Sequence, residues 1–305
     1  MRRRQTFLIL CVCGSVGLFV TGLVWRNLSN HSSPGKLPPL TRQAGPERSK
    51  PLYGRPFTGV LMWENDRKFR EFYAKTKLSI RMAAFQTTLP DPLPGEEYNV
   101  ALTADRLAGT TLQPGAEFSM NRRVGPYDGR HGFREGPTYV GGKVAKTSGG
   151  GVCKIASTLY NVTTLANLQI LERHPHGMQV PYVPPGQDAT VSEGYQDFRF
   201  RNNSKTPIFI WADTRGNTLY MAIYGGSKPP IVRWHHRILS RVPTYTVYRS
   251  NPKLRPGEQK IVVPGADGLT VRSWLTIRRP DGTVEIRDLG VSHYRPLPQL
   301  MERRK

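Results

Sequence analysis

An uncharged apolar run of 19 residues extends from Phe7 to Trp25. Only the rest of the chain is therefore able to form a water-soluble core. The run has the length that one helix needs to cross a bilayer. Three arginines, Arg2 to Arg4, precede the run and only Arg26 closely follows it, which predicts a cytoplasmic N-terminus and an extracytoplasmic body. No small-residue cleavage site follows Trp25, which favours a retained anchor over a cleaved signal peptide. We therefore expect a single-pass protein of the cell membrane, anchored by residues 1–25.

Residues 26–56 are rich in proline, glycine and basic side chains, and this composition is typical of a flexible basic spacer. The whole chain has 44 Lys+Arg against 22 Asp+Glu, a formal net charge of +22, which indicates an anionic polymer as a partner. An extracytoplasmic body argues against nucleic acid, and the sequence has no helix-turn-helix or RNA-binding pattern. Peptidoglycan or an anionic wall polymer is the expected partner, together with the membrane itself.

The remaining residues predict an α+β fold with mixed helices and antiparallel strands. Residues 57–240 have helical and strand-like segments, among them a helix from Val152 to about Leu171 with apolar residues three and four apart. The stretch from Gly125 to Gly151 is glycine-rich and lacks periodicity, so we expect a long irregular loop there. Residues 241–305 contain strand-like runs separated by Asp-Gly turns, which predicts a small all-β C-terminal extension.

A glycine run and a cysteine, Gly149-Gly150-Gly151-Val152-Cys153, stand where the loop passes into this helix. Free amides and the helix dipole at a helix N-terminus stabilise a thiolate, and the same amides are able to hold an oxyanion. Cys153 is therefore a candidate nucleophile for acyl transfer, and the three glycines are candidate binding residues. The alternative is that Cys153 is a buried, inert thiol and that the glycines only allow close packing.

A nucleophilic cysteine needs a base, and the sequence leaves several candidates open. His174 and His176 follow the helix, but a helix continuous to Ile170 would span ~25 Å and place both histidines far from Cys153. A break near Asn167 would remove this objection. The proline-rich stretch after Gly177 can also return along the helix and bring Tyr182 or Asp188 beside the thiol, and His131 in the preceding loop is a further candidate.

No metal site or cofactor site is predicted. His235 and His236 are adjacent, so that in a strand they would point to opposite faces. The glycine run lacks the Lys-Ser/Thr continuation of a phosphate-binding loop.

Several ordered segments of the chain, between about residues 75 and 225, are similar to the VanW family, which is named from glycopeptide-resistance gene clusters of Gram-positive bacteria. The resemblance implies an exported, cell-envelope protein and says little about chemistry. The family usually has Gln where this chain has Lys154, directly after the cysteine. The C-terminal segment from Leu254 onward more weakly resembles a glycine-rich β module of the wall-binding kind. The matching segments are Leu112–Ser119, Val124–Pro126, Gly132-Phe133, Gly149–Cys153, Ser157–Asn161, Glu172–His176, Tyr182–Gly186 and Asp188–Val191.

Two functions therefore remain in view, beside a third interpretation to which no residue points, a scaffold that positions other envelope enzymes. The first is a membrane-anchored envelope protein of the VanW type that binds peptidoglycan or an anionic wall polymer. The alternative is a cysteine-dependent acyl-transfer enzyme, similar to an amidase or transpeptidase, that acts on wall peptides through Cys153 with Asp188, His174 or His176 as partner. The sequence does not decide whether the chain is an enzyme.

Overall fold

The computed structural model describes residues 53–76, 78–89, 92, 95–140 and 143–304. The chain divides into two units, residues 1–48 and 49–305, and all the described residues belong to the second. The predicted anchor and nearly all of the predicted spacer lie outside the described residues. Within the part that is described, no helix is both long enough and apolar enough to span a bilayer.

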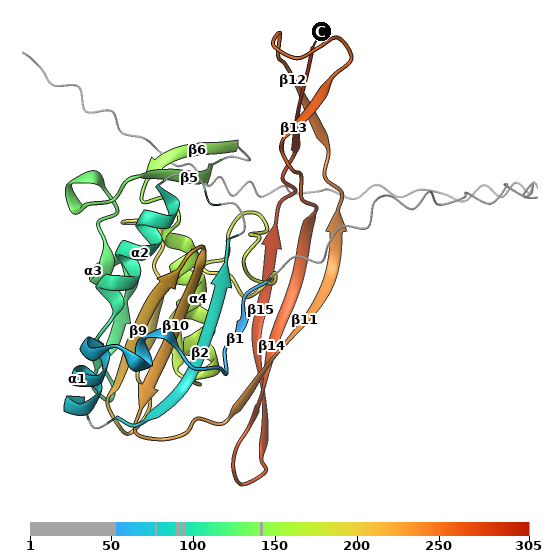
Figure 1. Ribbon diagram of the computed structural model, residues 1–305. Helices are drawn as coiled ribbons and strands as arrows, with labels where there is room; N and C mark the ends of the chain where they lie inside the picture. The colour runs from blue at the N-terminus through green and yellow to red at the C-terminus, as the bar shows by residue number, and fades with distance from the viewer. Residues whose placement is uncertain (1–52, 77, 90–91, 93–94, 141–142, 305) are drawn as a thin grey trace, which may run out of the picture. The chain divides into compact units, whose positions relative to one another are not determined.

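A five-stranded antiparallel sheet organises the first part of the described chain. Its strand order is β1-β2-β10-β9-β3 (Figure 1). The β9–β10 hairpin closes through the turn at Gly216, which has a positive φ of 53°. The strands are β1 (Arg55–Pro56), β2 (Ile80–Thr88), β3 (Thr110–Leu112), β9 (Ile208–Arg215) and β10 (Thr218–Gly225).

Both faces of this sheet are covered, which explains why β9 is almost continuously apolar. Ile208 and Ile210 face the larger core, which is built with helices α2 (Glu96–Leu107) and α4 (Val152–Leu165). Phe209 and Trp211 face an aromatic cluster on the other side, with the 3-10 helix η1 (Met62–Asn65) and helix α1 (Arg67–Thr76). Successive side chains of β9 point to opposite faces of the sheet and so enter different cores. Helix α4 packs in the larger of these two cores.

Helix α4 is shorter than the sequence predicts, and the difference decides the geometry of the site. It ends at Leu165 rather than near Leu171, because Asn167 adopts a left-handed conformation with φ 55°. The amide of Asn167 donates to the Thr164 carbonyl at 2.9 Å, and that of Leu168 donates to the Thr163 carbonyl at 3.1 Å. This is the bond pattern of a Schellman C-cap, and asparagine is the residue after glycine that best tolerates it. The chain therefore reverses and continues as strand β7 (Gln169–Glu172).

The glycine-rich stretch from Gly125 to Gly151 is not the irregular loop that was expected. It contains the 3-10 turn η2 (Gly129–His131) and a hairpin of strands β5 (Glu135–Val140) and β6 (Lys143–Ser148). The two strands carry few apolar residues, so the sequence has little of the alternation that reveals a half-buried strand. Nearby, β4 (Glu117–Ser119), the short helix α3 (Met120–Val124), β7 and β8 (Arg199–Arg201) complete this part of the fold, with sheet order β4-β8-β7.

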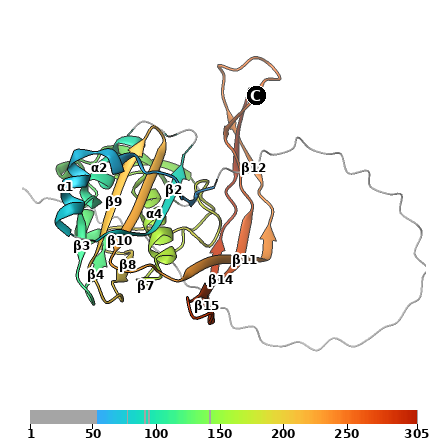
Figure 2. The same ribbon diagram turned by 60° about the horizontal axis from the view of Figure 1, so that its bottom comes forward.

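The C-terminal residues form two three-stranded sheets. One has the order β11-β14-β15, and its strands lie side by side in both views (Figures 1 and 2). The other has the order β12-β16-β13, in which β12 and β16 are parallel. The mixed fold with an all-β C-terminal region is thus confirmed, with β11 starting before residue 241. The strands are β11 (Ile231–Val242), β12 (Thr246–Ser250), β13 (Gln259–Val263), β14 (Gly268–Arg278), β15 (Val284–Tyr294) and β16 (Gln299–Arg303).

Candidate functional site

Cys153 lies in the first turn of α4 and keeps part of its surface exposed, although the residues around it on the helix are buried. The backbone amides on either side of Cys153 both donate hydrogen bonds. Val152 donates to the Gly149 carbonyl at 3.2 Å, and Lys154 donates to the Gly151 carbonyl at 3.0 Å. The Cys153 amide donates to none of the described backbone carbonyls. The thiol therefore stands at the positive end of a 14-residue helix, beside an N–H group that is not used in the helix cap.

The glycines before Cys153 are required by packing. A Cβ on Gly150 would lie 2.3 Å from the backbone carbonyl carbon of Gly136 in β5, and one on Gly151, which has φ +101°, would lie 2.7 Å from Cγ of Glu96. A Cβ on Gly149 would meet Tyr127 at 2.7 Å. Protein atoms thus fill the space beside the three glycines at which a ligand was considered. The binding role of these glycines remains a prediction.

Gly150→Ala is expected to destabilise the fold by about 2–4 kcal/mol, because the new methyl group collides with backbone that has no freedom to move as a side chain would. Gly129→Ala is the matched control, since no atom lies within 4 Å of its Cβ position. Urea unfolding of both variants measures the difference. Equal stability of the two variants would contradict this packing role.

The reversal after α4 brings His176 back to the start of the helix, beside Asp188. Thr190 donates its backbone N–H to the His174 carbonyl at 2.9 Å, which pairs the segment that holds His176 with the segment that holds Asp188. Asp188 Oδ2 accepts the backbone N–H of His176 at 2.6 Å and contacts its ring Nδ1 at 2.7 Å. Because Nδ1 is engaged by the carboxylate, Nε2 is the ring nitrogen left to interact with Cys153.

Polar side chains of α4 hold the Asp188 segment in place. Ser157 Oγ donates to the Ala189 carbonyl and accepts the Ala189 amide, both at 2.9 Å. One turn further along, Asn161 Nδ2 donates to the Gln187 carbonyl at 2.7 Å. Both side chains are fully buried. They fix the backbone on either side of Asp188 at the level of the helix that carries Cys153.

The charges of the three groups support one another. Burial opposes ionisation of Cys153, but the hydrogen bond and charge of His176 outweigh it and lower the pKa of the thiol below its usual value. Burial likewise opposes the imidazolium, yet Asp188 and Cys153 raise the pKa of His176 to about 9. Burial also raises the pKa of Asp188, but His176 and Arg173 lower it to about 2. The three groups thus favour one another's charged forms, a thiolate and an imidazolium beside a carboxylate.

Two further groups contact the sulfur itself. Thr190 Oγ1 lies 3.2 Å from Sγ, and the Val191 carbonyl lies 3.7 Å from it. Tyr182 is buried at the site, and burial together with the charges of Cys153 and Asp188 raises the pKa of its hydroxyl well above the usual value. Tyr182 thus belongs to the wall of the site as a neutral hydroxyl.

The other histidine candidates bond to different partners. His174 Nε2 bonds to Glu172 Oε1 at 3.0 Å, and His131 lies in η2 with its Nδ1 2.7 Å from Asp128. The expectation that a long helix keeps His174 and His176 away from the thiol was wrong for His176, because α4 ends early. Of the predicted partners, His176 acts on Cys153, and Asp188 holds His176.

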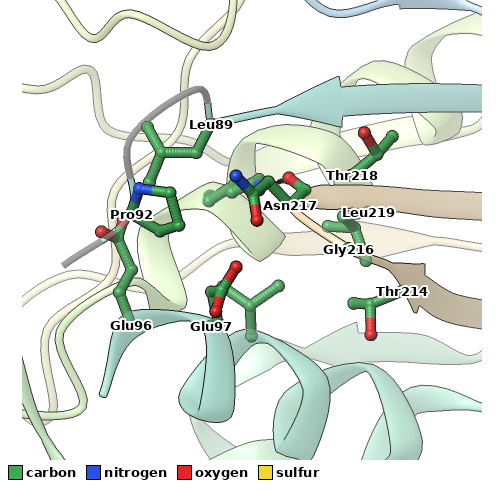
Figure 3. A pocket seen from close by; sticks show the side chains of 11 residues that line it. Leu89, Pro92, Glu96, Glu97, Thr214, Gly216, Asn217, Thr218 and Leu219 are labelled. Atoms are coloured by element: carbon green, nitrogen blue, oxygen red, sulfur yellow. Dashed lines mark hydrogen bonds between the residues drawn. The ribbon is translucent and has the colours of Figure 1, made fainter. Parts of the chain in front are cut away.

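Lys154, which the resemblance to the VanW family singles out, points away from the thiol. Its Nζ donates to the Asn217 carbonyl in the β9–β10 turn at 2.8 Å, and burial lowers its pKa to about 8. Lys154 also lines a pocket between the start of α2 and this turn, where Glu96, Glu97 and Thr218 lie (Figure 3). The cation that acts on Cys153 is therefore His176 and not the neighbouring lysine.

The sequence did not single out three residues that complete the site: Thr190, Arg173 and Tyr294. The first two stand in segments that match the VanW family, so a signal was present. Tyr294 is 106 positions from the carboxylate it contacts, and no local pattern points to it. Among the described residues, no group of three or more His, Cys, Asp or Glu side chains is arranged to hold a metal ion.

Comparison with known proteins supports the resemblance. The family model for VanW like protein matches residues 95–224. The chain is 40% identical over 127 residues to the uncharacterized protein YoaR of Bacillus subtilis, covering 42% of each chain. It is 30% identical over 137 residues to the vancomycin B-type resistance protein VanW of Enterococcus faecalis, covering 43% of this chain and 50% of that protein. The matches thus span half or less of the length of these relatives.

Two solved structures are also similar to part of the chain. The G5 domain of IgA1 protease aligns with a TM-score of 0.17 and 17% identity, over 27% of this chain and 98% of that domain. The HP0197-G5 structure aligns with a TM-score of 0.14 and 16% identity, over 24% of this chain and 96% of the other.

Proposed function

We propose that this chain, whose residues 95–224 form a VanW-like domain, is a cell-envelope protein that performs cysteine-dependent acyl transfer on wall peptides. One observation carries the proposal: Cys153, His176 and Asp188 meet at the N-terminus of α4, with the imidazole held by Asp188 and acting on the thiol. A nucleophile, a base and a group that orients the base are the parts that amide acyl transfer requires.

The reaction that we infer has the following steps. The Cys153 thiolate attacks the carbonyl carbon of a peptide amide, forming a C–S bond. The Cys153 amide at the helix N-terminus stabilises the oxyanion. The C–N bond then breaks as the His176 imidazolium gives its proton to the leaving amine. An incoming amine or water, deprotonated by His176, attacks the thioester, and the C–S bond breaks to restore the thiolate.

Peptides of the cell wall are the substrate class that agrees with the remaining features. The apolar run Phe7 to Trp25 predicts a body outside the membrane, and the net charge of +22 favours an anionic environment such as the wall. One of the relatives is a vancomycin B-type resistance protein. These features support an extracytoplasmic location beside the membrane.

Acyl capture tests this function. The purified chain is incubated with peptide fragments of peptidoglycan, and mass spectrometry then examines the peptide that carries Cys153. We expect an added acyl group on Cys153, which is removed by hydroxylamine and is absent from Cys153→Ser. Release of new amines from the fragments by Cys153→Ser at the rate of the unaltered chain would contradict the proposal.

A specific surface of the C-terminal sheets favours polymer binding as a second function. Arg233 and Arg237 are exposed on β11, and no acidic side chain lies within ion-pair distance of either among the described residues. The same region presents exposed apolar and aromatic side chains that are able to pack against sugar rings. They are Ile238, Leu239, Val242, Tyr245 and Tyr248.

Binding to purified cell walls is expected to weaken about tenfold when the ionic strength rises from ~0.05 M to ~0.5 M, because salt screens the attraction between exposed charges. Replacing Arg233 and Arg237 together by Gln should weaken binding at low salt. Replacing Arg67 and Lys68 on α1 by Gln removes the same charge from another exposed region and is the matched control. Co-sedimentation measures the bound fraction. Binding that is insensitive to salt, or equally weakened by both pairs, would contradict this role.

A further inference from the structure

Strand β15 of the C-terminal sheet reaches the carboxylate of the candidate site. The Tyr294 hydroxyl donates to Asp188 Oδ1 and accepts the backbone N–H of Gly186 at 2.6 Å. Two residues earlier, Ser292 Oγ accepts a hydrogen bond from Arg173 Nη1 at 2.9 Å. Arg173 Nη2 in turn donates to Asp188 Oδ1 at 3.0 Å. All four side chains have little or no contact with solvent, so these bonds are made in a largely dry environment.

The two oxygens of Asp188 are used by different partners. Oδ1 is bound by Tyr294 and Arg173, whereas Oδ2 is bound by the ring and the backbone of His176. A carboxylate fixed at one oxygen cannot rotate freely at the other. The hydroxyl of Tyr294 therefore helps to orient the imidazole of His176 through Asp188, although it contacts neither His176 nor Cys153.

The same sheet also holds the chain between His176 and Asp188. The Arg295 amide donates to the Gly177 carbonyl at 2.7 Å, directly after His176. At the other end, Gln187 Nε2 lies 2.8 Å from His236 Nε2 of β11. A Cβ on Gly186 would lie 2.2 Å from Ser273 Oγ of β14, so the strand and the loop are in close contact. The loop that joins the two candidate catalytic residues is thus supported at both ends by the C-terminal sheet.

We propose that Tyr294 is a positioning residue of the Cys153–His176–Asp188 site, and that the sheet β11-β14-β15 is therefore part of the reacting unit rather than an attached binding module. The inference rests on the proposed cysteine chemistry. It assigns the C-terminal region a role in reactivity that is separate from any binding of wall polymer. The charge of Asp188 also raises the pKa of four other ionisable groups, which are Arg173, His176, Tyr160 and Tyr182.

Tyr294→Phe tests the proposal, because it removes only the hydroxyl and keeps the ring. The rate of alkylation of Cys153 by iodoacetamide is measured from pH 5 to pH 10 in the full chain, by mass spectrometry of the peptide that contains Cys153, so that Cys11 and Cys13 do not interfere. We expect a fall of about threefold at neutral pH and a profile displaced to higher pH. Tyr195→Phe removes the same hydroxyl from an exposed side chain outside the site and outside the polymer-binding surface, so it is the matched control and should leave the profile unchanged.

A double-mutant cycle separates positioning from a purely structural role. In an Asp188→Asn background, Tyr294→Phe should change the alkylation profile no further, because the carboxylate through which it acts is gone. If Tyr294 serves only to hold the sheet, Tyr294→Phe will lower the melting temperature in both backgrounds and leave the profile unchanged in the first. That result would overturn the proposal. Should Tyr294→Phe fold poorly, Ser292→Ala gives the same test through Arg173.

The outcome also distinguishes this inference from the function on which it rests. An alkylation profile in the unaltered chain that does not respond to His176→Gln would remove the cysteine chemistry and the inference together. A profile that responds to His176→Gln and Asp188→Asn but is identical for Tyr294→Phe and Ser292→Ala would overturn the positioning role alone.

Discussion

His176→Gln should slow alkylation of Cys153 at pH 6 by about 30-fold, because the thiol loses the imidazolium that favours its ionised form. An ordinary cysteine with a pKa of ~8.5 is less than ~1% thiolate at pH 6, and the higher nucleophilicity of the less acidic thiol offsets only part of that loss. The expected sign follows from the structure, in which His176 lowers the pKa of Cys153. Iodoacetamide labelling followed by peptide mass spectrometry measures the rate.

His174→Gln is the matched control for this experiment. The same change is made two positions away, in a side chain that bonds to Glu172 and not to the thiol. Labelling of Cys153 should be unaffected by it. Equal effects of the two substitutions, or no effect of either, would mean that His176 does not act on Cys153 as the structure indicates.

The second large effect is expected on stability. Asp188→Ala should reduce the free energy of unfolding by about 3–5 kcal/mol, because it leaves the buried cations Arg173 and His176 without their shared carboxylate. Asp188 is fully buried and bonds to both of them. Urea unfolding at pH 7 measures the loss. Asp105→Ala removes an exposed carboxylate, 74% accessible and 3.7 Å from Lys68, and should cost less than about 0.5 kcal/mol.

The free energy of unfolding should also depend on pH through the ionisation of Asp188 and His176. The pKa of Asp188 is about 2 in the folded chain and ~3.9 in an unfolded one, so its contribution is present above pH ~4 and is lost as the pH falls towards 2. His176 acts in the opposite direction. Its pKa is about 9 when folded, so its contribution is present below pH ~6.5 and is lost as the pH rises through 9. An unfolding free energy in Asp188→Asn that falls between pH 4 and 2 as steeply as in the unaltered chain would contradict the assignment.

The sequence allowed the local part of the site to be predicted. A glycine run before an amphipathic helix placed Cys153 in the first helical turn, and the structure puts it there. Most strands that alternate or that are bounded by Asp-Gly turns were also predicted, because pleating and turn chemistry act over a few residues. His176 and Asp188 were among several candidates left open, since His176 follows the helix and Asp188 lies in a proline-rich stretch that is able to return along it.

The rest depended on contacts that no local pattern contains. The end of α4 is set by a left-handed Asn167 with only weak sequence signals, and that single turn decides whether His176 lies beside Cys153 or far from it. The β5–β6 hairpin lacked the apolar alternation that reveals a strand. Arg173 stabilises the site only because the fold brings Asp188 against it. Tyr294 reaches the site from strand β15, which was predicted as a strand with no indication of what it packs against.

The most direct test of the central claim is the pH profile of Cys153 alkylation in the unaltered chain. If the thiol is held as a thiolate by His176 and Asp188, its reactivity should already be close to its maximum at pH 7 and decline only in more acidic solution. A rate that is low at pH 7 and rises through pH ~8.5, as for a free cysteine, would show that Cys153 is not activated and would contradict the account.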